Sequence, residues 1–349
     1  MLNSSFTKVF VFILNILLTS QLAAEQAAPK HISYLTSWGL DRNSSEQLQH
    51  SKVDAFFLAF AKWDRNGTIT ATDGMLNSPE SIAYKTWTKL AHNRPNTEFY
   101  LSFGGQNFED IWDQLSNDDI IANIANGIVS TLTKPYPVFE DDAQGRPIKI
   151  GSVQIDGIDL DFEQSSRLTL SQNRALKKLA TQLRTRLERR KKIVLTTYHV
   201  GADPLLCLNN PSELVCSYRE TPSSSHHGEV ISLLRSSSSL FDFYNIMTYD
   251  AGRDFDYQQS LQNYAVYIKD KSKLRVGITI NKQWSEDGGF VMPKSDNLKR
   301  ACWAKDNGYG GFFVWALGAN TESISLLRQT DYVNDLIQCH SLLEPIDQN

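Results

Sequence analysis

Eight short apolar runs rich in β-branched and aromatic residues recur along the chain, and each is followed by a longer stretch with helical periodicity. Their spacing continues over roughly 290 residues without a linker, which fits one closed parallel barrel better than two doubly wound domains. The sequence therefore predicts the α/β class and a single (β/α)8 TIM barrel. The runs are His31–Trp38, Val53–Ala61, Glu98–Gly105, Ile155–Glu163, Ile193–Val200, Phe241–Asp250, Leu274–Asn281 and Gly311–Ala319.

The clearest helix follows the fourth run, where Leu176, Leu179, Leu183 and Leu187 recur on one helical face. The basic segment Arg184–Lys192 is then the solvated end of that helix rather than a nucleic-acid patch. The formal net charge of −4 also gives no indication of nucleic-acid binding. In a barrel of this kind, we expect functional residues at the carboxyl ends of the strands.

The amino terminus differs from the rest of the chain. A weak basic region at Lys8 precedes an apolar run from Val9 to Leu18 and small residues up to Ala24. The run is shorter than the roughly 20 residues needed to span a bilayer. We therefore predict a signal peptide over residues 1–24, removed to give a mature domain over 25–349 that is secreted (extracellular or periplasmic) and not held in a membrane. The alternative is an uncleaved anchor.

Four cysteines lie in this mature part of the chain. An even number in an exported protein suggests disulfides, for which three pairings are possible. Closeness in sequence favours Cys207 with Cys216 and leaves Cys302 to pair with Cys339. No CxxC or HxxxH spacing accompanies them, so we predict no metal site.

Two connections are longer than a barrel requires, namely Lys134–Gly151 and Gly201–Gly228. We expect both to be surface loops on the substrate side of the barrel.

The fourth run ends in Asp156-Gly157-Ile158-Asp159-Leu160-Asp161-Phe162-Glu163, in which carboxylates alternate with apolar residues. Successive side chains of a strand point to opposite faces. Asp159, Asp161 and Glu163 therefore lie on one face, which is the barrel interior if the apolar set faces the helices.

Stacked carboxylates at intervals of about 6 to 7 Å repel one another, which raises the pKa of at least one of them. Glu163 at the strand tip is placed to stay protonated and to act as an acid. The alternatives are a metal site and an edge strand with solvated acids, and no histidine lies near in the sequence to favour the metal.

The segment resembles the DxxDxDxE signature of the family 18 glycoside hydrolases, which include chitinases and endo-β-N-acetylglucosaminidases. Three further segments resemble motifs of that family in the same order. They are Ser102-Phe103-Gly104-Gly105, Met247-Thr248-Tyr249-Asp250 and the last-strand segment that ends in Trp315. The resemblance spans most of the mature chain.

The resemblance implies a substrate-assisted retaining mechanism without a cofactor. Glu163 would protonate the glycosidic oxygen while the acetamido carbonyl of the sugar attacks the anomeric carbon. Asp161 would orient the acetamido N–H, Asp159 would share a proton with Asp161, and Tyr249 would contact the acetamido oxygen.

The remaining candidate residues bind substrate or support the strand. Trp315 would form the floor of the sugar site, although it could instead pack in the core. Lining of the same site is expected from Met247, Asp250, Tyr198 and Trp38. Trp63 and Trp284 are further possible stacking platforms. Structural support is expected from Asp156, Ser102, Gly104 and Gly105.

Phe162 stands where many family members carry tryptophan, and the fifth run ends in a form that matches no family motif. Both departures concern substrate preference. Our main hypothesis is an endo-acting chitinase on chitin or another N-acetylglucosamine polymer, with a monomer as the default state. The alternatives are an endo-β-N-acetylglucosaminidase acting on N-glycan cores and a non-catalytic chitinase-like lectin.

Overall fold

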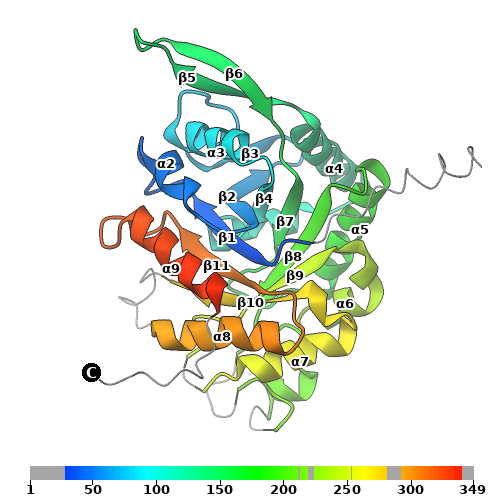
Figure 1. Ribbon diagram of the computed structural model, residues 1–349. Helices are drawn as coiled ribbons and strands as arrows, with labels where there is room; N and C mark the ends of the chain where they lie inside the picture. Colours follow the sequence, from blue (N-terminus) through cyan, green and yellow to red (C-terminus); the bar gives the residue numbers. More distant parts are fainter. Residues whose placement is uncertain (1–27, 211–212, 219–223, 253, 281–291, 340–349) are drawn as a thin grey trace, which may run out of the picture.

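The computed structural model describes residues 28–210, 213–218, 224–252, 254–280 and 292–339. Within them, eight parallel strands form a closed barrel with helices between the strands (Figure 1), so the predicted fold is confirmed. Most ends of the barrel strands lie within two residues of the ends of the predicted runs. They are β1 (His31–Thr36), β2 (Ala55–Trp63), β4 (Glu98–Gly104), β7 (Gly157–Asp161), β8 (Lys192–Tyr198), β9 (Phe243–Met247), β10 (Leu274–Thr279) and β11 (Phe312–Leu317).

The barrel closes because β1 pairs in parallel with both β2 and β11. Ile32 lies opposite Ala55 on one side and opposite Phe313 on the other. A short strand, β3 (Ile69–Ala71), adds to β2 in antiparallel orientation. Since all eight barrel strands run in one direction, their carboxyl ends meet at one rim.

The helices that cover the barrel are amphipathic, and the longest of them shows why. In α5, Leu176, Leu179 and Leu183 are fully buried, as the spacing predicted, and Thr169 begins the helix with a capping box that includes Gln172. The helices are α2 (Ser44–Gln49), α3 (Ile82–Asn93), α4 (Asp118–Thr133), α5 (Leu170–Arg186), α6 (Ile231–Ser237), α7 (Tyr257–Tyr267), α8 (Lys294–Asp306) and α9 (Leu326–Gln338).

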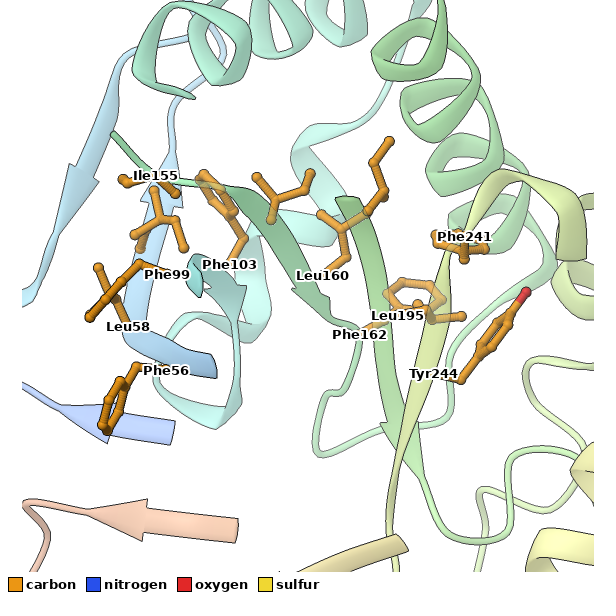
Figure 2. Packing of buried hydrophobic residues seen from close by; sticks show 14 of the residues in the cluster. Phe56, Leu58, Phe99, Phe103, Ile155, Leu160, Phe162, Leu195, Phe241 and Tyr244 are labelled. Carbon is orange, nitrogen blue, oxygen red and sulfur yellow. The ribbon is translucent and has the colours of Figure 1, made fainter. Parts of the chain in front are cut away.

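Two apolar cores hold the strands in place. The inner core fills the barrel and includes Tyr34, Phe57 and Phe243. The outer core lies between strands and helices, and Figure 2 shows part of it, including Leu160 and Phe162. Each fully buried large apolar side chain stabilises the fold by about 1.5 to 3 kcal/mol. Because strand side chains alternate between the cores, the acidic face of β7 has one possible direction, into the barrel.

The prediction for Lys134–Gly151 is wrong. This segment forms most of a hairpin of β5 (Tyr136–Asp141) and β6 (Pro147–Val153), which projects beyond α3 in Figure 1. It connects α4 to β7, so it reaches the amino end of β7, on the rim opposite the substrate side. The described residues of Gly201–Gly228 follow β8 and begin at the carboxyl rim, as predicted.

Both favoured disulfides are present. Cys207 and Cys216 have Cα atoms 5.7 Å apart, and the bridge closes a loop after β8. Cys302 in α8 is joined to Cys339 at the end of α9, with Cα atoms 5.3 Å apart. The predicted signal peptide and Trp284 lie outside the described residues. Within the described ranges, no helix combines the length and the apolar character needed to cross a membrane.

Candidate active site

A cavity of about 230 Å³ opens at the carboxyl rim of the barrel. Eight predicted site residues line it, and four further residues complete the wall. The predicted residues are Trp38, Asp161, Glu163, Tyr198, Met247, Tyr249, Asp250 and Trp315. The additional residues are Phe60, Gln106, Asn107 and His199.

The carboxylates of β7 enter the barrel as the alternation requires. Ile158, Leu160 and Phe162 are fully buried in the outer core, whereas Asp159 and Asp161 are buried on the other face. Glu163 follows the strand and is partly exposed in the cavity. Asp159 therefore lies deepest, and Glu163 is the most accessible of the three acids.

Three hydroxyl groups from other barrel strands surround Asp159. Tyr34 and Ser102 donate to its Oδ2 at 2.7 Å, and Thr196 donates to its Oδ1 at 2.6 Å. Burial raises the pKa of Asp159 to about 6, and the three hydrogen bonds oppose that rise. Hydrogen bonds of this kind favour the ionised form. Asp159 is thus the buried acid that is equipped to hold a negative charge.

Asp161 has the opposite environment. Its Oδ1 is buried and has no hydrogen-bond partner in the described part of the chain. Burial raises the pKa of Asp161 well above its ordinary value, and repulsion from Glu163 and then Asp159 adds to the rise. We therefore expect the proton of the Asp159–Asp161 pair to reside on Asp161.

Burial raises the pKa of Glu163 to about 7. Hydrogen bonding from the Tyr198 hydroxyl and the Gln106 backbone N–H lowers this pKa in part, while the negative charge of Glu109 raises it. A carboxyl group that titrates near neutral pH can donate a proton and later accept one. This property fits the predicted role of a general acid and base.

The backbone around Glu163 is held by side chains from the segment after β4. Trp112 donates its indole N–H to the Glu163 carbonyl oxygen at 3.0 Å. Glu109 accepts hydrogen bonds from the backbone N–H and the hydroxyl of Ser165. Both contacts come from η2 (Gln106–Gln114), which therefore fixes the loop that carries the acid.

The end of β9 places three predicted residues in the cavity. Burial raises the pKa of Tyr249 well above its ordinary value, and the charges of Asp161 and Glu163 add to this. The Tyr249 hydroxyl therefore stays protonated and able to donate. Asp250 adopts a left-handed backbone conformation with φ 53°, uncommon for a residue other than glycine. Burial raises its pKa to about 6.

The apolar wall is aromatic. Trp315 stacks on Phe60 with ring centroids 5.5 Å apart, and Trp38 lies 6.4 Å from Trp315. Met247, next to them, is 5% exposed. Trp63, by contrast, points away from the cavity and packs between Phe103 and other aromatic rings of the outer core, so it is not a platform for sugar.

The predicted support residues contact the acidic strand. Gly104 has φ 99°, and a Cβ there would lie 2.5 Å from the Trp112 ring and 2.6 Å from the Asp161 carbonyl oxygen. Gly105 donates its backbone N–H to the same oxygen at 3.2 Å. Only glycine permits this approach between β4 and β7.

Asp156 lies at the opposite end of β7 and accepts a hydrogen bond from the Phe99 backbone N–H at 2.8 Å. Phe99 in turn accepts from the Asp156 N–H at 2.7 Å. Asp156 therefore fixes the alignment of β7 with β4 and lies away from the cavity.

Four wall residues were missed in the sequence. Gln106 and Asn107 directly follow the Ser102–Gly105 segment, and His199 directly follows Tyr198, so their proximity to motif residues was a usable signal. Phe60 lies within an apolar run, where nothing distinguishes a cavity residue from a core residue.

One cluster in the described part of the chain has the composition of a metal site, formed by Asp203, Cys207 and His227. The Cys207 sulfur is bonded to Cys216 and cannot act as a thiolate ligand. Asp203 accepts hydrogen bonds from Ser217, and the cluster holds the loop after β8 in place.

Comparisons with known proteins agree with this geometry. The sequence model of the glycosyl hydrolases family 18 matches residues 30–299. The fold is similar to that of a GH18 chitinase from Pseudoalteromonas aurantia, with a TM-score of 0.61, 16% identity, and coverage of 89% of this chain and 100% of that chain. No curated protein sequence matches the chain.

Two further structures extend the comparison. A GH18 chitinase from Cycas revoluta in complex with (GlcNAc)3 has a TM-score of 0.59 and 14% identity, with coverage of 88% and 99%. A chitinase-like agglutinin from Robinia pseudoacacia has a TM-score of 0.59 and 12% identity, also with coverage of 88% and 99%. Identities this low show a common fold alone.

Proposed function

The chain belongs to the family 18 glycosyl hydrolases, and on this basis we propose that it is a secreted, endo-acting chitinase. Its substrate is a β-1,4-linked N-acetylglucosamine polymer or oligomer. The observation that carries the proposal is the meeting of Glu163, Asp161 and Tyr249 in one cavity with an aromatic wall.

The proposed reaction uses the substrate as its own nucleophile. Glu163 donates its proton to the glycosidic oxygen while the acetamido carbonyl oxygen of the same sugar bonds to the anomeric carbon. The glycosidic bond breaks, the leaving chain departs with the proton, and an oxazolinium ion remains. Water then attacks the anomeric carbon, the bond from that carbon to the acetamido oxygen breaks, and the Glu163 carboxylate accepts a proton from the water. The anomeric configuration is retained.

Asp161 and Tyr249 act on the acetamido group in this scheme. The Asp161 carboxylate accepts a hydrogen bond from the acetamido N–H and stabilises the positive charge that develops on the ring. In the part of the chain that the structure describes, Oδ1 of Asp161 has no hydrogen-bond partner. This supports the role, because a buried polar atom without a partner is costly until a ligand supplies one. The Tyr249 hydroxyl donates to the acetamido oxygen and orients it.

Asp159 holds the negative charge of the pair when Asp161 is protonated, and the two exchange that proton during the reaction. Trp315 supplies the flat face against which the sugar ring lies, with Trp38 and Met247 beside it. Asp250 and Tyr198 contribute polar groups to the sugar site. The Cycas revoluta chitinase, solved with (GlcNAc)3, supports a substrate of this class.

Secretion is part of the same proposal. The predicted signal peptide over residues 1–24 directs export, and the two disulfides suit an oxidising compartment. The mature enzyme, over residues 25–349, acts outside the cytoplasm as a monomer.

The test is hydrolysis of a chromogenic chitotriose glycoside by the mature chain and by Glu163→Gln. We expect the variant to lose about 10² to 10⁴ in kcat, because the general acid is absent. Glu322→Gln, which removes an exposed carboxylate, is the matched control and should leave kcat unchanged. Equal activity of wild type and Glu163→Gln would refute the assignment of the acid.

A second substrate distinguishes the two enzymatic hypotheses. If the wild type leaves chitin oligomers intact but releases glycans from a glycoprotein, the protein is an endo-β-N-acetylglucosaminidase. If it binds chitin oligomers without cleaving either substrate, the lectin hypothesis takes its place. The similarity to the Robinia pseudoacacia agglutinin gives that alternative a specific basis.

A further inference from the structure

The connection between β8 and α6 brings a histidine next to the proposed acid. The ring of His226 lies on the ring of Tyr198, with centroids 4.3 Å apart and an angle of 37° between the planes. The Tyr198 hydroxyl donates to the backbone carbonyl oxygen of Gln164, the residue after Glu163, at 3.5 Å. It is also close enough to the Glu163 carboxyl to lower the pKa of that group. His226 is thus one aromatic ring away from Glu163.

The orientation of this imidazole is fixed. Its Nδ1 lies 2.8 Å from Oε2 of Glu229, whose side chain is fully buried. The same Glu229 oxygen accepts the backbone N–H of Leu168 at 2.9 Å. Because Leu168 lies in the connection that follows Glu163, a single carboxylate aligns the histidine with the loop that carries the acid.

Arg167 provides a second link between the loop that follows Glu163 and the connection that carries His226. Its Nη1 donates to the carbonyl oxygens of Ser225 and His227, each at 2.7 Å. These two residues are the chain neighbours of His226, so the backbone is held on both sides of it. Such a set of contacts leaves the ring little freedom to leave Tyr198.

His226 is also close enough to Glu163 to act on it electrostatically. A protonated imidazole attracts the carboxylate and lowers the pKa of Glu163, opposing the effects of burial and of Glu109. The titratable or charged groups near the ring or near the Glu163 carboxyl come from four elements. They are Glu163 and Arg167 after β7, Tyr198 and His199 at the end of β8, His227 and Glu229 in its own connection, and Glu109 in η2.

We propose that His226 is a positioning residue for the acid/base, because its imidazole packs on Tyr198 and holds that ring beside Glu163. Glu229 is the residue that orients it. The inference rests on the proposed function, since it assigns a role only if Glu163 is the acid. It also gives a function to the end of β8, which matches no family motif.

The first test is a titration that requires no turnover. The side-chain carboxyl of Glu163 is followed by 13C NMR in protein labelled at the glutamate δ-carbon, with Glu163→Gln used to assign the signal. In His226→Gln we expect the Glu163 titration to move upward by about half a pH unit, since a nearby positive charge is lost. His50→Gln, which removes an exposed histidine of another helix end, is the control.

Kinetics then separate the charge of His226 from its packing. His226→Phe keeps an aromatic ring on Tyr198, so kcat should stay within about twofold while the basic limb of the pH profile moves upward. His226→Ala removes the ring, and kcat should fall about tenfold with a smaller change in KM. Glu229→Gln releases the orientation of the ring and should resemble His226→Ala in kcat.

The outcomes are distinct. An unchanged Glu163 titration in His226→Gln together with an unchanged kcat in His226→Ala overturns the inference. If the wild type cleaves no substrate but the Glu163 titration still moves, the proposed function fails while the link between His226 and Glu163 stands.

Discussion

Replacing Glu163 by glutamine should stabilise the fold while removing activity. Glutamine has the shape of the protonated carboxyl group but cannot ionise. Burial raises the pKa of Glu163 from 4.5 to about 7, so the folded state holds the proton over a range in which the unfolded chain has already lost it. Above pH 7 the folded protein must keep a partly buried charge beside Asp161, which costs free energy.

The magnitude follows from the two pKa values. A difference of about 2.5 in pKa corresponds to about 3 kcal/mol of unfolding free energy. The sign is fixed because a raised carboxyl pKa means that the folded state binds more protons, so stability falls as the pH rises from about 4.5 to about 7. Glu163→Gln should therefore gain up to about 3 kcal/mol at pH 8 and little at pH 4.

The assay is urea denaturation of wild type and Glu163→Gln at pH 4, 6 and 8, followed by tryptophan fluorescence. Glu322→Gln removes the same charge from an exposed site and should change the unfolding free energy by less than about 0.5 kcal/mol. A gain that is equal at pH 4 and pH 8 would show that charge is not its cause. No gain at pH 8 would show that the Glu163 carboxylate is well solvated or paired.

Three shorter predictions concern the surroundings of the acids. Ser102→Ala removes a hydroxyl that donates to Asp159 and should cost about 1.5 to 3 kcal/mol in urea denaturation at pH 7. Gly104→Ala should cost more than about 2 kcal/mol in the same assay, whereas Gly145→Ala, where a Cβ meets nothing within 4 Å, should cost about 1 kcal/mol. Trp315→Ala should raise the Kd for chitotriose at least about tenfold by calorimetry in an inactive background, as expected for loss of a buried aromatic platform.

The sequence predicts the barrel and the acidic face because both depend on short-range patterns. Strand and helix periodicities fix the order of elements, and the alternation around Asp159 and Asp161 fixes which face each side chain joins. Since the apolar residues of β7 are buried on one face of the strand, its acidic side chains can point only to the other face, into the barrel. Contacts between residues distant in the chain cannot be predicted in this way.

The features that the sequence analysis missed depend on such long-range contacts. His226 and Glu229 approach Glu163 only after α5 and the long connection after β8 have folded, and no spacing in the sequence connects them. Trp63 was assigned to the site because it ends a strand, and strict alternation from the inward-facing Phe57 would place it inside the barrel. An irregularity in β2 between Leu58 and Ala61 instead turns it outward, which no sequence pattern indicates. The hairpin before β7 was placed on the wrong rim because length indicates a loop without indicating which rim it joins.

The same long-range contacts explain how three acids on one strand come to differ. Asp159 receives hydroxyl groups from three other strands, through Tyr34, Ser102 and Thr196, and these hold its charge. Among the described residues, Asp161 has no partner at Oδ1, and burial raises its pKa, so we expect it to keep the proton. If the hydroxyls were removed, Asp159 would compete for that proton and leave a charge on Asp161, closer to Glu163 along the strand. The pKa of Glu163 would then rise further, and Glu163 would become a weaker proton donor to the glycosidic oxygen. The hydroxyls around Asp159 thus influence the chemistry of Glu163 without contacting it.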